Sequence, residues 1–280
     1  MTRTNIPCVV SIAGTDPSGG AGIQADLKAI SATGSYAASI ITALVAQNTQ
    51  GVRAIYPIPT DFVQQQIDAV FDDLDIKAVK IGMLFEAAMI EQIASALETL
   101  KPPHIVFDPV MVAKDGSVLL DLSTIAFLKQ RFLPLTHLIT PNRFEAEQLL
   151  GTPINTLDDM VEAARALSLE YKLHVLLKGG HFDGEESADL LYNHQTHEVR
   201  WYRAPRINTK NTHGTGCSLS SAIASYLAQG LALEEACDAA KEYITQAILS
   251  GRDLGVGKGQ GPVDHFYFLT SSFTPRVGEH

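Results

Sequence analysis

The residues best suited to chemistry lie in segment 211–217, which reads Asn-Thr-His-Gly-Thr-Gly-Cys. Gly214 and Gly216 leave the backbone bare where a helical pattern begins. The first N–H groups of a helix have no partner within it, and the helix dipole adds positive charge there. This segment therefore predicts a phosphate-binding site. The same helix start is expected to lower the pKa of the Cys217 thiol, although free cysteines are also common as small buried residues.

Two polar segments near the amino terminus suit a small ligand. Segment 14–22 is dense in glycine and leads into a helical pattern carrying Asp26, whose carboxylate either faces a ligand or interacts with the helix dipole. The segment is neither a Walker loop nor a dinucleotide fingerprint. In segment 47–51, the Gln47 amide can donate and accept at once, which suits a flat heterocycle. A capped turn is the alternative interpretation of that second segment.

Four charged or polar side chains follow predicted strands. Asp108, Asn142 and Glu145 carry the hard oxygen atoms that suit Mg²⁺. Asn142 and Glu145 also have the spacing of a helix-capping box. Lys178 precedes two glycines and can either reach a phosphate as a point charge or lie in solvent. With the anion site, this set matches phosphoryl transfer, which depends on positioning and charge neutralisation. His213 fits a structural or capping role better than that of a base.

These residues need elements that bring them together. Short apolar runs predict strands at 8–13, 76–81, 104–107, 137–140, 174–177 and 190–192. Helical spacing predicts helices at 21–33, 62–74, 86–100, 122–132, 143–150, 157–169, 214–229 and 234–249. Apolar strands separated by helices predict an α/β fold with a mostly parallel sheet covered on both faces. Because the carboxyl ends of parallel strands share one edge, the loops after them should converge.

Composition limits the function classes. The 280 residues are 46% hydrophobic and 19% charged, which fits one globular domain over 1–280 with tails at about 1–6 and 270–280. The net charge of −10 argues against a nucleic-acid partner. No apolar run approaches the roughly 18–20 residues of a membrane span. Three scattered cysteines fit a reducing compartment, so a cytoplasmic location is expected.

Seven segments together resemble a known family, the bacterial hydroxymethylpyrimidine/phosphomethylpyrimidine kinases of thiamine biosynthesis. The resemblance extends from about residue 9 to residue 262 and rests on segments in the family's order: 14–28, 43–52, 80–84, 108–114, 140–146, 178–181 and 212–218. It implies a three-layer ribokinase-like fold, a homodimer, and two steps that depend on ATP and Mg²⁺. The first step phosphorylates the hydroxymethyl group of 4-amino-5-hydroxymethyl-2-methylpyrimidine, and the second adds a further phosphate.

The resemblance also implies roles for particular residues. The pyrimidine pocket would be lined by Gly14, Ala21, Asp26, Gln47, Met83 and Val110. Gln47 would contact the amino group and ring nitrogen, and Met83 and Val110 would pack on the apolar parts of the ring. The catalytic anion hole would be formed by Gly214, Thr215, Gly216 and Cys217, with Cys217 at the position of the superfamily's base. ATP would contact Lys178, Asn142 and Thr215, and the metal would contact Asp108 and Glu145.

Two other functions stay open from the sequence. The first is a pyridoxal kinase, because related proteins with the same cysteine-bearing anion hole phosphorylate vitamers of that kind. The second is a ligand sensor without catalysis, which the intact set of charged residues argues against. Segment 115–120 is a candidate flap over the site. Segment 256–262 resembles the family's glycine-rich carboxyl-terminal segment, which is placed near the nucleotide or in a plain turn.

Overall fold

A computed structural model describes residues 6–111, 122–180 and 184–269. Its strands are β1 Cys8–Ala13, β2 Tyr36–Ile41, β3 Ala43–Asn48, β4 Gly51–Pro57, β5 Ile76–Ile81, β6 Ile105–Phe107, β7 Leu138–Ile139, β8 His174–Leu177, β9 Glu186–Tyr192 and β10 Val199–Pro205. Its α-helices are α1 Gly22–Ala32, α2 Thr60–Phe71, α3 Ala87–Leu100, α4 Leu122–Arg131, α5 Arg143–Leu150, α6 Leu157–Tyr171, α7 Thr215–Ala228 and α8 Leu233–Gly251. Two short 3-10 helices are η1 Leu133–Leu135 and η2 Tyr267–Leu269.

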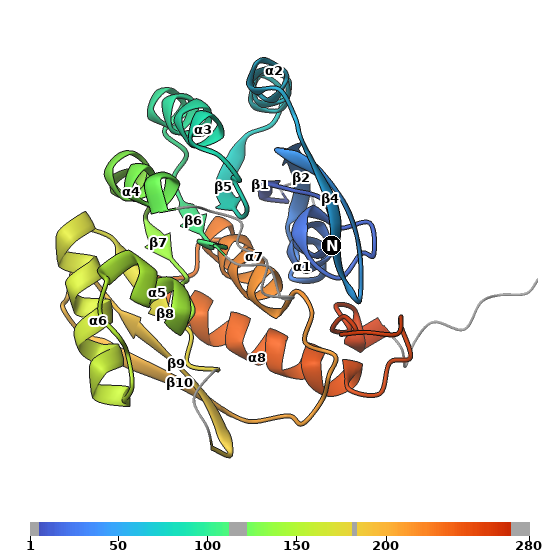
Figure 1. Cartoon of the computed structure of the whole chain (residues 1–280), viewed down its shortest axis with the longest axis vertical. Coiled ribbons are helices and arrows are strands. Elements are labelled where there is room, and N and C mark those ends of the chain that lie inside the picture. Colours follow the sequence, from blue (N-terminus) through green and yellow to red (C-terminus); the bar gives the residue numbers. More distant parts are fainter. Residues whose placement is uncertain (1–5, 112–121, 181–183, 270–280) are drawn as a thin grey trace, which may run out of the picture.

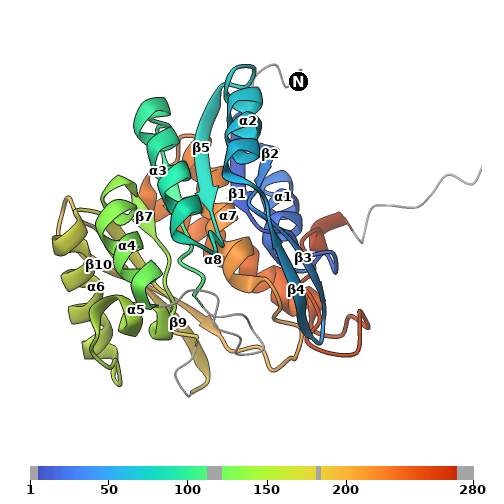
Figure 2. The same cartoon turned by 45° about the horizontal axis from the view of Figure 1, so that its top comes forward.

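Eight strands form one sheet in the order β10-β9-β8-β7-β6-β5-β1-β2. The six strands from β8 to β2 run parallel, whereas β9 is antiparallel to both of its neighbours. The strands β3 and β4 form a separate antiparallel hairpin, which Figure 2 shows extending beside the carboxyl-terminal segment. The predicted mostly parallel sheet is confirmed.

Helices cover both faces of the sheet (Figure 1). Alternate strand residues enter two separate apolar clusters, as the two-residue period of a strand requires: Ile105 and Phe107 join one cluster, and Val106 joins the other. The first cluster contains residues of α2 to α6, and the second contains residues of α1, α7 and α8. The three-layer α/β arrangement is therefore as predicted.

The structure adds strands that the apolar patterns did not predict. Segment 40–45, which is apolar except for Thr42, is divided at Thr42 between β2 and the hairpin strand β3. The segment 47–51 contains the end of β3, a two-residue turn and the start of β4, so the turn interpretation was correct for its last residues. β10 was missed because it lies at the edge of the sheet and carries polar, exposed residues such as Arg200 and Arg203 between its apolar ones.

Three histidines lie at the amino ends of β6, β7 and β8, on the sheet edge opposite the polar loops. Burial lowers the pKa of His104, of His137 and of His174. The Nδ1 atom of His137 accepts a hydrogen bond from the Ile105 amide at 3.1 Å, and the Nδ1 atom of His174 accepts one from the His194 amide at 3.1 Å. A nitrogen that accepts a hydrogen bond carries no proton, so both rings are neutral in the folded chain.

Acidification is therefore expected to destabilise the fold. Because the pKa of these histidines is lower when folded than when unfolded, the unfolded chain takes up protons first as pH falls below about 6.5, the unfolded pKa of histidine. Stability should be full above that pH and decline below it. His137→Asn keeps an acceptor for the Ile105 amide but does not titrate, so its urea-unfolding free energy should vary less between pH 7.5 and 5.5. An unchanged pH dependence would remove His137 from this explanation.

Candidate active site

The predicted phosphate site is a loop at the start of α7. Gly214 is the N-cap residue with φ of +79°, in the left-handed region that glycine favours. A Cβ atom on Gly214 would lie 1.8 Å from the carbonyl oxygen of Gly20. The Thr215 hydroxyl donates to the Thr212 carbonyl at 3.1 Å, which fixes the loop from within. Gly214 is thus needed for both the turn and the close approach of a second loop.

A buried ion pair brings the ends of two other strands to this loop. Lys178, after β8, donates to Oδ1 of Asp108, after β6, at 2.7 Å. The Thr140 hydroxyl donates to the same oxygen at 3.2 Å. A Cβ atom on Gly216 would lie 3.2 Å from Lys178 Nζ and 3.4 Å from Asp108 Oδ2, so both charges face the start of α7. The convergence expected from the parallel sheet is present, and Lys178 is not a solvated lysine.

The predicted metal and nucleotide residues on α5 form a capping box. The Asn142 side chain accepts from the Glu145 amide at 3.0 Å, and Glu145 Oε2 accepts from the Asn142 amide at 2.7 Å. Glu145 is nevertheless buried beside the ion pair: its burial and the charge of Asp108 raise its pKa, while Lys178 lowers it. A short parallel bridge also joins Asn142 to Lys178. The two residues are therefore structural and lie at the candidate site as well.

The expected fall in the pKa of Cys217 is wrong. Burial raises the pKa of this thiol to about 11, because a thiolate loses solvation there. The charge of Lys80 lowers the pKa, but the carboxylates of Asp26 and Asp108 raise it. A backbone hydrogen bond from Gly22 also lowers the pKa, but burial and the two nearby negative charges outweigh these effects.

Alkylation of Cys217 should report this raised pKa. Below the pKa, the thiolate fraction and hence the rate with iodoacetamide should rise about tenfold per pH unit. For Cys217, followed by peptide mass spectrometry, this rise should continue past pH 9, whereas a free thiol such as glutathione levels off near its own pKa of about 8.5. A Cys217 rate that levels off below pH 8 would contradict the raised pKa.

The Asp26 side chain was expected to line the pyrimidine pocket, but it lies in a buried ion pair instead. Its side chain is fully buried, and both carboxylate oxygens lie 2.8 Å from Nζ of Lys80, which is also fully buried. Ser11 on β1 and Ser221 on α7 donate to the same carboxylate at 2.6 and 2.9 Å. Asp26 is therefore enclosed in an ion pair between the sheet and α7, and direct contact with a ligand does not fit this arrangement.

The other predicted pocket residues gather around the ends of β1, β3, β5 and β6, and all except the buried Gly14 are partly exposed. They are Gly14, Ala21, Gln47, Met83 and Val110. A Cβ atom on Gly14 would lie 2.6 Å from the terminal methyl carbon of Met83 and 3.7 Å from Cγ2 of Val45. The bare backbone of Gly14 thus allows Met83 and the hairpin to meet. Their role in binding a pyrimidine stays a prediction.

Two residues that make many contacts at the site were not predicted from the sequence as site residues. Asp16 is fully buried and accepts from His213 Nε2 at 2.8 Å. Lys80 is the buried partner of Asp26. The strand pattern does not predict that Lys80 is buried, because lysine is rarely buried in an apolar strand unless it is paired with an opposite charge. For Asp16 a local signal existed: Asp-Pro-Ser-Gly is typical of a turn in which the aspartate accepts backbone N–H groups.

The glycine-rich segment near the carboxyl terminus lies against the tip of the β3–β4 hairpin. The Gly259 amide donates to Thr49 Oγ1 at 3.1 Å, and the Gln260 amide donates to the Thr49 carbonyl at 2.8 Å. The His213 amide donates to the Gly261 carbonyl at 3.0 Å. The segment therefore links the hairpin tip to the residues that lead into the phosphate loop.

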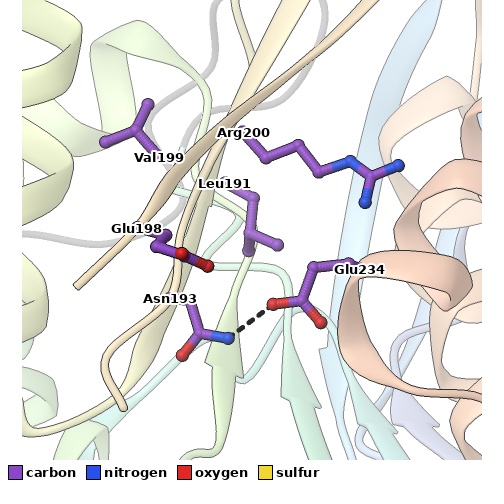
Figure 3. Close-up of a pocket in the computed structure, with 6 residues that line it drawn as sticks. All are labelled: Leu191, Asn193, Glu198, Val199, Arg200 and Glu234. Carbon is purple, nitrogen blue, oxygen red and sulfur yellow. Dashed lines mark hydrogen bonds between the residues drawn. The ribbon is translucent and has the colours of Figure 1, made fainter. Parts of the chain in front are cut away.

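A pocket of about 340 Å³ lies away from this site (Figure 3). It is lined by Leu191, Asn193, Glu198, Val199, Arg200 and Glu234, and the Asn193 amide donates to Glu234 within it. Asn193 follows β9, which runs antiparallel to β8, so the pocket lies at the sheet edge opposite the phosphate loop. None of the predicted site residues lines it.

The remaining sequence-based expectations concern membrane helices, metal clusters and segments outside the described residues. Within residues 6–111, 122–180 and 184–269, no helix is long and apolar enough to cross a membrane. In the same ranges no group of three or more His, Cys, Asp or Glu side chains is arranged to hold a metal ion. The candidate flap 115–120, the end of segment 178–181 and the tail 270–280 lie outside the described residues.

Two curated proteins are similar to this chain over nearly all of its length. The chain is 49% identical over 257 residues to the bifunctional thiamine biosynthesis protein ThiED of Geobacter sulfurreducens, covering 92% of this chain and 52% of that protein, so it spans about half of its length. It is 48% identical over 268 residues to the hydroxymethylpyrimidine/phosphomethylpyrimidine kinase of Escherichia coli K12, covering 95% of this chain and 99% of that enzyme.

A solved structure shows the same fold. Bacillus subtilis pyridoxal kinase in complex with ADP matches with a TM-score of 0.87 and 35% identity, covering 95% of this chain and all of that chain. The fold is ribokinase-like. The family model of phosphomethylpyrimidine kinase matches residues 16–264, which include Asp108, Lys178 and the phosphate loop. This chain belongs to the phosphomethylpyrimidine kinase family.

Proposed function

We propose that this chain is an ATP-dependent kinase with two successive reactions. It phosphorylates the hydroxymethyl group of 4-amino-5-hydroxymethyl-2-methylpyrimidine and then adds a second phosphate to the monophosphate. The observation that carries the proposal is the approach of the Asp108–Lys178 pair to Gly216, at the start of α7. A cation beside the start of a helix supports binding of a phosphate there, because both favour negative charge. Family membership supplies the substrate class.

The chain's own groups neutralise and orient the transferred phosphate. The backbone N–H group of Gly216 would face developing negative charge without having to reorganise, whereas the Thr215 N–H donates to the Thr212 carbonyl at 3.4 Å. Lys178 adds a fixed positive charge, and nearby Asp108 and Glu145 raise its pKa against the effect of burial, so it stays protonated. ATP is the proposed phosphate donor, in keeping with the ADP complex of the Bacillus subtilis pyridoxal kinase.

The residues present fit Mg²⁺. Among the described residues, the side-chain hydrogen bonds of Asp108 use Oδ1 and that of Glu145 uses Oε2, which leaves the second oxygen of each carboxylate for a cation. One or two carboxylates with phosphate oxygens and water are typical ligands of Mg²⁺. When bound, Mg²⁺ would neutralise phosphate charge. Asp108 and Glu145 would hold it, and Asn142 would orient Glu145 through the capping box.

Cys217 is the proposed proton acceptor, at Sγ. With a pKa of about 11, most of the thiol is protonated near neutral pH, so only the minor thiolate form can accept the proton of the substrate hydroxyl. Phosphoryl transfer needs little help from a base until late in the reaction, which makes such a minor form sufficient. Cys217→Ala should then lower kcat of the first step with little change in KM. An unchanged kcat would make Cys217 a packing residue.

The hairpin offers a surface for the proposed homodimer. Leu44 and Tyr56 are directly opposite each other on β3 and β4 and are 48% and 64% exposed. The cross-strand pair Ala46 and Ala54 continues the same exposed apolar face. A second copy would cover this face, so Tyr56→Glu is expected to shift the mass measured by light scattering from dimer to monomer. A dimeric Tyr56→Glu variant would place the interface elsewhere.

One coupled assay tests the function against its nearest alternative. ATP consumption is measured with the pyrimidine alcohol and with pyridoxal, because the Bacillus subtilis neighbour is a pyridoxal kinase. We expect the higher kcat/KM with the pyrimidine alcohol, and a diphosphate product. A preference of about 100-fold for pyridoxal, roughly 2.7 kcal/mol, would replace the proposal by the vitamer kinase. We further propose that the chain acts as one domain in the cytoplasm, in keeping with its three scattered cysteines.

A further inference from the structure

The chain that follows α8 is attached to the residues that lead into the phosphate loop. The His213 amide donates to the Gly261 carbonyl at 3.0 Å, and a short parallel bridge joins His213 to Pro262. The side-chain amide of Asn211 donates to the carbonyl of Gly251, the last residue of α8, at 2.8 Å. The entry to the phosphate loop is therefore fixed by the carboxyl-terminal part of the chain.

A second contact from the same part of the chain reaches the first turn of α7. His265 Nε2 lies 2.8 Å from the hydroxyl oxygen of Ser218, and this hydroxyl donates to the Gly214 carbonyl at 2.8 Å. The Ser218 amide donates to the same carbonyl at 2.9 Å. Ser218 is fully buried and His265 is only 4% exposed. The three residues thus form a buried chain of hydrogen bonds that ends on the N-cap residue of α7.

The direction of these hydrogen bonds follows from the number of protons available. A hydroxyl has one proton, and Ser218 donates it to the Gly214 carbonyl, so the Ser218 oxygen accepts from His265 Nε2. Burial, aided by the charge of Lys28, lowers the pKa of His265 to about 4, so the ring is neutral near neutral pH and its one proton lies on Nε2. The hydrogen bonds therefore run from His265 through Ser218 to Gly214.

His265 is itself held against α8. Its carbonyl accepts from the Tyr243 hydroxyl at 3.1 Å, and the amide of the preceding Asp264 donates to the Ala247 carbonyl at 3.0 Å. A Cβ atom on Gly251 would lie 2.7 Å from the Asp264 amide nitrogen, so this segment packs directly on the helix. The imidazole ring therefore has a fixed support from which it can hold the start of α7.

The Gly214 carbonyl is a point of the phosphate loop that needs such support. Glycine adopts positive and negative φ with similar ease, so the peptide group between Gly214 and Thr215 can turn at little cost. Such a turn would break the first hydrogen bond of α7 and displace the Gly216 N–H from the proposed phosphate position. The two hydrogen bonds from Ser218 oppose the turn, and His265 orients the hydroxyl that makes one of them.

We propose that His265 is a positioning residue for phosphoryl transfer, which holds the Gly214 carbonyl through Ser218 and thereby fixes the start of α7 toward the phosphate. The inference rests on the proposed function and deepens it, because it names a residue 47 positions beyond Ser218 on which the orientation of the phosphate loop depends. His265 contacts no substrate in this account and acts only through Ser218. The carboxyl-terminal segment is then a working part of the site.

Steady-state kinetics with ATP and the pyrimidine alcohol provides the first test. His265→Leu removes the donor to Ser218, so kcat should fall at least about 10-fold, the scale of a small misplacement at a reacting centre. KM for the pyrimidine alcohol should stay within about threefold, because the phosphate rather than the ring is misaligned. His265→Gln retains an N–H donor and should recover kcat to within about threefold of wild type. Equal losses of kcat in the leucine and glutamine variants would overturn the proposal.

Two further variants show whether the effect passes through Ser218. Ser218→Ala should lower kcat as His265→Leu does, and the double variant should be no worse than either single one, as a double-mutant cycle requires. Tyr243→Phe is the matched control, because it removes a hydrogen bond to the backbone of His265 but leaves the contact with Ser218. It should lower the thermal transition without lowering kcat. A loss of kcat in Tyr243→Phe equal to that in His265→Leu would make the segment a general support, and the proposal would fail.

Hydrogen exchange separates this inference from the proposed function. A peptide covering 212–219 should exchange faster in His265→Leu than in wild type, because the bond from the Ser218 amide to Gly214 opens more often, and it should exchange as in wild type in His265→Gln. Equal exchange in wild type and His265→Leu would overturn the inference while the function stands. If His265→Leu does not fold, Ser218→Ala decides through its kcat. If the wild-type chain consumes no ATP with the pyrimidine alcohol, the proposed function fails, and exchange still shows whether His265 holds the loop.

Discussion

Lys80→Met is expected to destabilise the folded chain by about 3–5 kcal/mol, because it leaves the Asp26 carboxylate buried without its cation. Both side chains of this pair are fully buried, and Nζ lies 2.8 Å from each carboxylate oxygen. The remaining donors, Ser11 and Ser221, are neutral and cannot replace a charge. Such a loss is a large part of the 5–15 kcal/mol that typically separates folded from unfolded states. Urea unfolding followed by circular dichroism measures it.

A lysine on the same strand provides the control. Lys77 pairs with Asp75 at 2.6 Å, but its side chain is 46% exposed, so Lys77→Met should change the unfolding free energy by less than about 1 kcal/mol. Adding Asp26→Asn to Lys80→Met removes the unpaired charge and should recover part of the loss. Equal stability of Lys80→Met and Lys77→Met would show that the buried pair is not needed for folding.

Gly214→Ala is expected to lower kcat/KM at least about 100-fold, the scale of losing an aligned donor at a developing charge. The new Cβ atom would lie 1.8 Å from the Gly20 carbonyl oxygen, so the phosphate loop and the loop around Asp16 must move apart. That movement displaces the N–H groups at the start of α7 from the phosphate. Steady-state kinetics with the pyrimidine alcohol measures the effect.

The matched control is Gly230→Ala, beyond the other end of the same helix. Gly230 has φ of +90°, and an added Cβ atom would meet nothing within 4 Å. Both substitutions carry the cost of a left-handed alanine, about 1–2 kcal/mol, but only Gly214→Ala forces two loops apart. Gly230→Ala should therefore keep its kinetics while losing a similar part of its stability. If both variants had the same kcat/KM, the contact between the loops would have no catalytic role.

The local sequence pattern was sufficient to predict the strands and the helix that carry the candidate site residues. Strands β1, β5 and β8 have the predicted limits, because mostly apolar runs bounded by glycine, proline or polar residues leave little choice of end point. Helix α5 also has its predicted limits, since Asn142 and Glu145 form the capping box that their spacing indicates. The common edge for Asp108 and Lys178 followed from the parallel sheet alone.

That local pattern could not predict contacts between segments that are distant in the sequence. The partner of Lys80 is 54 residues away, and that of Asp16 is 197 residues away in His213, so neither pair leaves a periodic signal. The β3–β4 hairpin was missed because its face carries exposed apolar residues such as Leu44 and Tyr56, which do not alternate with polar ones as a half-buried strand would.

By itself, the sequence of this chain determined the layered fold, the edge at which polar loops meet and the position of the loop proposed to bind phosphate, because each depends on local spacing and the direction of parallel strands. Only the tertiary structure decided the charge states. Asp26 is enclosed by Lys80, and the pKa of Cys217 is raised rather than lowered, because burial and the carboxylates of Asp26 and Asp108 outweigh the charge of Lys80. Solvation and long-range contacts set these properties, and neither is written in neighbouring residues.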